Sequence, residues 1–156
     1  MIFYILFSVL LIIGLYCAFQ ISVADFRRRI IPDAYLFPLM LIGLALVTFY
    51  EWPLGIYDAT IGALFGYILS SVVGFIFDYF LRRRVSDAPA PIGMGDIKLM
   101  GVGGLWLGTT GLSVALIIAC ITGAIWARRK HARFIPFGPF FIFGGILYLI
   151  SRLFLI

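Results

Sequence analysis

The stretch Gly93-Met94-Gly95-Asp96-Ile97-Lys98 leads directly into residues 99–127, a run of 29 residues without a charged side chain. A membrane-spanning helix needs about 20 apolar residues, so this run is too long for one ordinary span. Gly108-Thr109-Thr110-Gly111 lies within the run and predicts a tight turn between two spans. An ionised carboxylate at the centre of a bilayer costs on the order of 2.5 to 3.5 kcal/mol, so an aspartate beside this run is expected to have a function.

The composition of the whole chain predicts an all-α, polytopic membrane protein with the lipid bilayer as its environment. Of the 156 residues, 63% are hydrophobic and 12% are charged, and the mean hydropathy is +1.14. Further charge-free runs cover residues 1–24, 34–50, 59–77 and 134–151. The first run has neither basic residues before it nor small residues at a cleavage site, so we expect a span and not a cleaved signal peptide. With residues 99–127 divided in two, the sequence predicts six transmembrane helices.

The basic residues predict the orientation of these helices. They stand in short clusters between the apolar runs, which is typical of the cytoplasmic ends of membrane helices and argues against a nucleic-acid partner despite the net charge of +5. Six spans put eleven of the twelve lysines and arginines on one side, whereas five spans put only eight there. The positive-inside rule therefore predicts external N- and C-termini for a single membrane-embedded domain over residues 1–156.

Two of the seven carboxylates have no obvious structural role. Glu51 and Asp58 are expected outside the membrane, Asp33 is expected to be a helix N-cap, Asp78 to pair with Arg82, and Asp87 to lie in a loop. This leaves Asp25 and Asp96 at the same predicted face. Each could pair with a basic neighbour, Arg28 or Arg29 for Asp25 and Lys98 for Asp96, or the two aspartates could face each other.

Facing carboxylates would have a specific chemistry. Two carboxylates a few ångströms apart do not both ionise easily, so one carries a proton and the other a charge. The charged group can take a proton from water that attacks a peptide carbonyl, and the protonated group can hydrogen-bond to the carbonyl oxygen. This is the chemistry of an aspartic protease.

Three segments resemble the type IV prepilin peptidases, which are membrane-embedded aspartic proteases. Residues 93–99 resemble the GxGD signature of this family; Asp25 with its three arginines and Ile31-Pro32-Asp33 resembles the first catalytic aspartate and its sequel; and residues 135–139 are similar to a late Pro-Phe-Gly-Pro segment. The resemblance implies that Asp25 and Asp96 form the catalytic pair. It also implies removal of the leader peptide from type IV prepilins or type II secretion pseudopilins, at the cytoplasmic face of the plasma (inner) membrane.

The residues beside the two aspartates are candidates for binding the substrate. Glycines next to Asp96 leave room for an extended peptide backbone, and the proline-rich segment interrupts the start of the last span near the same face. The candidate substrate-binding residues are Gly93, Gly95, Lys98, Pro136, Phe137 and Gly138.

The chain also departs from the longer members of this family. Those members carry two Cys-x-x-Cys pairs in a cytoplasmic domain between the first two spans and are described as methylating the product. Here Asp25 and Asp33 are separated by only seven residues, and the cysteines Cys17 and Cys120 both lie inside apolar runs. The chain therefore resembles a short, peptidase-only form, in which no metal or other cofactor is expected and methyl transfer is doubtful.

Two further features bear on structure and function. Gly62 with Gly66, and Gly104 with Gly108, have the four-residue spacing that predicts close helix packing. A small transporter or channel subunit, in which Asp25 and Asp96 bind a cation or relay protons, is the alternative to a peptidase. Such a pathway would need polar groups through the outer halves of the spans, and these offer little beyond threonine and serine.

Overall fold

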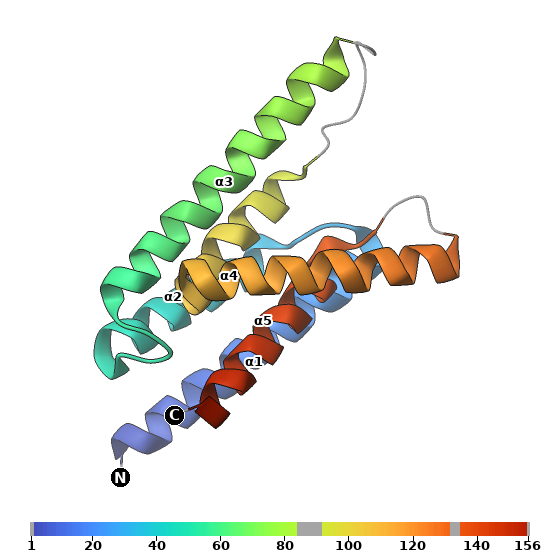
Figure 1. Ribbon diagram of the computed structural model, residues 1–156. Helices are drawn as coiled ribbons and strands as arrows, with labels where there is room; N and C mark the ends of the chain where they lie inside the picture. The colour runs from blue at the N-terminus through green and yellow to red at the C-terminus, as the bar shows by residue number, and fades with distance from the viewer. Residues whose placement is uncertain (1, 84–91, 132–134, 156) are drawn as a thin grey trace.

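The computed structural model describes residues 2–83, 92–131 and 135–155, and within these ranges all regular structure is helical. The five helices are α1 (Ile2–Arg28), α2 (Asp33–Tyr50), α3 (Ile56–Arg82), α4 (Met94–Lys130) and α5 (Phe137–Leu155), as Figure 1 shows. The all-α prediction is confirmed. Arg84, Asp87 and Arg133, which were used in the predictions of topology and loops, lie outside the described residues.

Four helices, α1 to α4, are long and apolar enough to cross a membrane, and α5 contains a shorter apolar segment, Phe137–Arg152. Many large apolar side chains on these helices face outward, as lipid-facing residues do. The 37 residues of α4 would extend about 55 Å as one straight helix, nearly twice the thickness of a hydrocarbon core. Six transmembrane spans and external termini remain predictions.

The helix α4 is not straight, because it changes direction at Gly108 (Figure 1). Gly108 has φ 67° and ψ −176°, and its neighbours on both sides are helical. A side chain would be strained at this positive φ, so glycine is required. The predicted turn therefore exists, but it is a break at one residue and not a four-residue loop over Gly108–Gly111.

Glycines bring α3 and α4 into close contact. A methyl group on Gly62 would lie 2.6 Å from Cα of Gly108, and one on Gly66 would lie 2.9 Å from the carbonyl carbon of Met100. Both distances are shorter than real contacts of a Cβ atom, so no larger residue fits without moving a helix. The predicted packing role of the paired glycines is confirmed.

The helices α1 and α2 form an antiparallel pair joined by residues 29–32. The hydroxyl of Tyr50, at the end of α2, donates to the carbonyl oxygen of Phe3 at the start of α1 (3.1 Å). The connection between α1 and α2 is therefore only four residues long.

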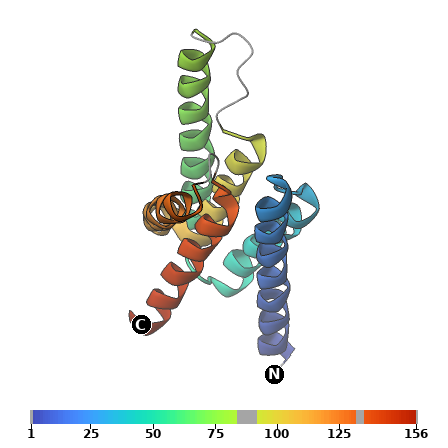
Figure 2. The same cartoon turned by 90° about the vertical axis from the view of Figure 1, so that its right-hand side faces the viewer.

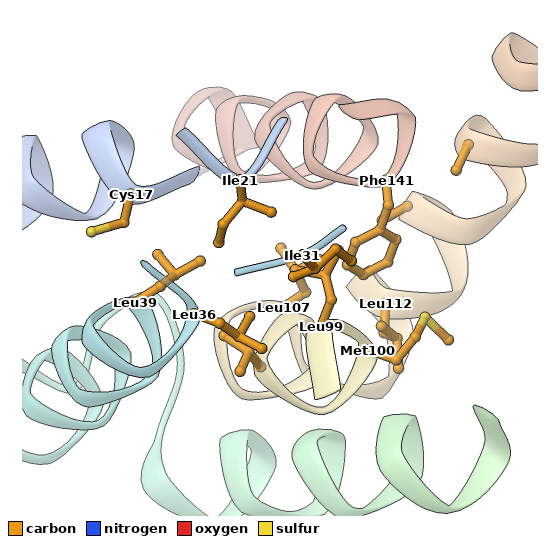
Figure 3. Close-up of a cluster of buried hydrophobic side chains, with 13 residues drawn as sticks. Cys17, Ile21, Ile31, Leu36, Leu39, Leu99, Met100, Leu107, Leu112 and Phe141 are labelled. Carbon is orange, nitrogen blue, oxygen red and sulfur yellow. The ribbon is translucent and has the colours of Figure 1, made fainter. Parts of the chain in front are cut away.

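A cluster of buried side chains from α1, α2, α4 and α5 holds these helices together (Figure 3). Its best-buried members include Ile21 on α1 together with Leu99 and Leu112 on α4. Burial of a large aliphatic side chain stabilises a fold by about 1.5 to 3 kcal/mol in water. In a bilayer the stabilisation from burying apolar side chains is weaker, because lipid is as apolar as the core. Close packing of the helices then contributes more of the stability.

Candidate active site

Asp25 is a buried carboxylate near the end of α1, where its side chain meets the start of α5. It is 5% exposed, and its Oδ2 accepts a hydrogen bond of 2.7 Å from the backbone N–H of Gly138. Gly138 is the second residue of α5, and N–H groups in the first turn of a helix have no partner within it. Burial opposes a negative charge on this carboxylate, whereas the positive end of the α5 dipole and the charge of Arg29 favour it.

The sequence around Gly138 suits this contact. A Cβ atom at position 138 would lie 3.0 Å from Oδ2 and 3.3 Å from Cβ of Asp25, so glycine leaves the space that the carboxylate fills. Pro139 has no N–H to donate, but it lies in the first turn, where that group is not needed by the helix. Pro136 is buried immediately before α5 begins.

Asp96 lies in the first turn of α4, three residues after the N-cap residue Gly93. It is half-buried, and its carboxylate interacts with the backbone N–H of Gly93 and, electrostatically, with Asp25. A carboxylate at this position of a helix commonly turns back to the N-cap N–H in this way. The two aspartates, 71 positions apart in the sequence, thus lie close enough to interact electrostatically.

Lys98 does not pair with Asp96. Its Nζ contacts both carboxylate oxygens of Asp33, at 2.7 and 2.9 Å, because α2 begins beside the start of α4. The predicted N-cap role of Asp33 is wrong: Pro32 is the N-cap residue, no side chain caps the helix, and Asp33 is the first helical residue. The predicted pairing of Asp78 with Arg82 is confirmed at 2.7 Å.

The other candidate substrate-binding residues have varied surroundings. A Cβ atom on Gly95 would lie 2.9 Å from Cβ of Ile31, so the space beside this glycine is filled by the chain itself. Gly93 is exposed, and Phe137 stacks on Phe141 with 5.3 Å between ring centroids. Substrate binding by these residues, and by Lys98, Pro136 and Gly138, remains a prediction.

The last turns of α4 lie beside the end of α1 and the start of α5. The ring of Trp126, near the end of α4, contacts the ring of Phe26 beside Asp25 (5.7 Å between centroids) and that of Phe140 on α5 (6.0 Å). Basic residues therefore gather at the aspartate end from the last turns of α1 and α4.

Sequence reasoning missed the hydrogen bond from Gly138 to Asp25 and the ion pair between Asp33 and Lys98. A glycine between two prolines at the start of a predicted span was the signal available for the first. For the ion pair, the sequence shows the opposite charges of Asp33 and Lys98, but nothing in it indicates that these two side chains contact each other. Within the described ranges, no group of three histidine, cysteine, aspartate or glutamate side chains could hold a metal ion.

These features define the class of protein: an all-helical protein with several candidate membrane spans and a pair of buried or half-buried aspartates at one end. The model of the type IV leader peptidase family matches residues 3–128, and the chain belongs to this family. It is a family of peptidases, so the comparisons do not favour the alternative of a transporter or channel subunit.

Several curated relatives are about 30% identical to the chain. The prepilin leader peptidase/N-methyltransferase of Burkholderia pseudomallei is 33% identical over 131 residues, which are 80% of this chain and 40% of the relative. The type 4 prepilin-like proteins leader peptide-processing enzyme of Escherichia coli O78:H11 is 31% identical over 127 residues, 80% of this chain and 45% of the relative. The prepilin leader peptidase/N-methyltransferase of Escherichia coli K12 is 30% identical over 133 residues, 81% and 56% respectively.

The chain thus spans about half the length of the curated relatives it matches. No solved structure gave a significant match.

Proposed function

We propose that this chain is an aspartic endopeptidase that removes the leader peptide from type IV prepilins or type II secretion pseudopilins. The observation that carries the proposal is the electrostatic interaction between Asp25 and Asp96. Asp25 lies near the end of α1 and accepts a hydrogen bond from the first turn of α5, and Asp96 lies in the first turn of α4. The names of the relatives, which include prepilin leader peptidase, support the substrate class.

The surroundings of the two carboxylates support different roles for them. Each carboxylate interacts with a backbone N–H at the start of a helix. The positive charge of Arg29 acts on Asp25, whereas Asp96 experiences the negative charge of Asp25, so we place the negative charge on Asp25. In the proposed reaction Asp25 takes a proton from a water molecule as the water oxygen attacks the carbonyl carbon of the scissile bond. A protonated Asp96 donates a hydrogen bond to the carbonyl oxygen. When the C–N bond breaks, Asp25 passes the proton to the leaving nitrogen, which yields a carboxylic acid and an amine.

The site would face the cytoplasm of a plasma (inner) membrane. The basic last turns of α1 and α4 lie at the aspartate end, and basic residues favour the cytoplasmic side. Because α4 changes direction at Gly108 and its last turns contact α1 beside Asp25, we infer that α4 crosses the membrane twice and the chain six times, with both termini external. A reporter fused within the 51–55 connection should be external, whereas one fused after Lys130 should be cytoplasmic.

The proposed reaction needs water but no cofactor. We propose that the chain cleaves without a metal ion and without a methyl donor, because its short 29–32 connection has no room for a metal-binding domain of the kind found in the longer members of the family. Cleavage should therefore persist after treatment with a chelator, and the new N-terminus should carry no methyl group.

The test is cleavage of a prepilin by the purified protein in detergent or liposomes. Mass spectrometry should detect a product shortened by its leader, and a preparation from membranes with an empty vector should produce none. Absence of cleavage with several prepilins and pseudopilins would contradict the proposal.

A further inference from the structure

A partly open cavity of about 340 Å³ lies within the bundle, and its lining is almost wholly apolar. It is bordered by α1, α4 and α5, with contributions from Leu39 on α2 and Trp52 in the following connection. Well-packed protein interiors contain few voids larger than a water molecule. A cavity of this size is within the range of ligand-binding pockets.

The cavity begins one helical turn from the candidate active site. Leu99, in its lining, follows Asp96 by three residues on α4, and Phe141 follows Gly138 by three residues on α5. On α1 the cavity extends from Ala18 to Leu11, away from Asp25, a rise of about 10 Å. It therefore runs from the aspartate end into the apolar part of the bundle.

The helices that border the cavity separate along its length. At the aspartate end α1 and α5 are joined by the bond from Gly138 to Asp25, but their far ends lie apart, as Figure 2 shows. An apolar segment of a substrate that lies in the bilayer could insert side chains between these two helices. The substrate backbone next to that segment would then pass the two aspartates.

We propose that this cavity binds the large apolar side chains of the substrate on the carboxyl side of the cleaved bond. The inference rests on the proposed function, in which the leader lies on the cytoplasmic side of the aspartates and the rest of the substrate lies in the bilayer. The charge-free lining excludes charged side chains from this subsite, since an unpaired charge there would be expensive. The cavity would thus select substrates in which bulky apolar residues follow the scissile bond.

Ala18 provides a clean test, because it lines the cavity, is not part of the aspartate site and already carries a Cβ atom. Ala18→Phe should fill part of the cavity, and Ala18→Leu should fill less. The matched control is Ala124→Phe, at an exposed position of α4. Each purified variant is assayed with a prepilin and with a prepilin whose first bulky apolar residues after the cleavage site are replaced by alanine.

For Ala18→Phe we expect kcat/KM on the natural prepilin to fall about tenfold or more, mainly through KM, with a smaller fall for Ala18→Leu. The alanine-substituted prepilin should be cleaved by Ala18→Phe at least as well as by the wild type, which also shows that the variant is folded. Ala124→Phe should behave as the wild type.

Equal losses on both substrates, or no loss on either, would overturn the inference. If Ala18→Phe cleaves normally but loses a lipid that co-purifies with the wild type, the cavity binds an acyl chain. This outcome also overturns the inference. If the wild type cleaves neither substrate, the proposed function has failed. If the wild type cleaves and Ala18→Phe does not discriminate, only the present inference has failed.

Discussion

The start and the middle of α4 contact the rest of the protein by different means. At its start, the contacts involve charged side chains: Asp96 interacts with Asp25, and Lys98 pairs with Asp33. In its middle, the contact with α3 is made by glycine backbones, with Gly62 against Gly104 and Gly108. The polar contacts lie at one end of the bundle, whereas the glycine contact lies at the centre of the apolar helices.

This difference follows from the surroundings of each region. Charged groups are tolerated where water and helix termini can stabilise them, so the carboxylates of Asp25 and Asp96 can lie at the first turns of α5 and α4. Within the apolar helices such groups are expensive, and close backbone packing replaces them. We therefore expect changes at the aspartate end to affect activity, and changes at the glycine contact to affect stability.

The largest effect is expected from removing either member of the aspartate pair. Asp25→Asn and Asp96→Asn keep the side-chain volume but remove the base or the shared proton, so cleavage of a prepilin should fall by about 100-fold or more. The thermal unfolding of both variants in detergent should stay close to that of the wild type. Asp58→Asn, at an exposed residue of α3, is the control and should keep full activity. Normal cleavage by either aspartate variant would remove that residue from the catalytic pair.

The glycine contact should be sensitive to side-chain size. Gly62→Leu would force α3 away from α4, because even a methyl group at this position overlaps the backbone of α4. We expect the free energy of unfolding to fall by about 1 to 3 kcal/mol, measured by thermal or denaturant unfolding in detergent. Gly55→Leu is the matched control, since a Cβ atom there meets nothing within 4 Å. Equal stability of the two variants would argue against close packing of α3 on α4.

Gly138→Ala tests whether the contact with Gly138 positions the Asp25 carboxylate for catalysis. The added methyl group would crowd the Asp25 carboxylate at 3.0 Å, so the carboxylate or the start of α5 must shift. A displacement of about 1 Å can reduce catalysis about 100-fold, and we expect a loss of about tenfold or more in kcat with a small change in KM. Gly74→Ala is the same change at a site with ordinary contact distances and should leave activity unchanged. Wild-type activity in Gly138→Ala would show that this hydrogen bond does not position Asp25.

The smallest effect is expected from the ion pair between Asp33 and Lys98. Their side chains are 49% and 39% exposed, and exposed pairs contribute about 0.2 to 1 kcal/mol. A double-mutant cycle with Asp33→Asn and Lys98→Gln should yield a coupling energy of this size in unfolding experiments. The pair of Asp78 and Arg82 within α3 provides a comparison, and its coupling should be similar. A coupling above about 2 kcal/mol would indicate a pair shielded from water.

Much of the fold could be predicted, because the relevant signals are local in the chain. The charge-free runs predicted the helices, although the four-residue turn expected at Gly108–Gly111 is a break at Gly108 alone. The paired glycines predicted the contact between α3 and α4, since spacing along one helix sets which residues share a face. The elimination of other carboxylates singled out Asp25 and Asp96 before their positions were known.

Other features depend on how distant segments pack, and only the three-dimensional arrangement reveals them. The N–H of Gly138 donates to a carboxylate 113 positions away. Lys98 pairs with Asp33 and not with its near neighbour Asp96, because α2 and α4 begin side by side. The apolar cavity likewise arises from side chains of four helices and one connection. Hydropathy and charge are properties of each residue and can be read along the chain. The partner of a carboxylate and the space left between helices are set by the packing of the whole bundle.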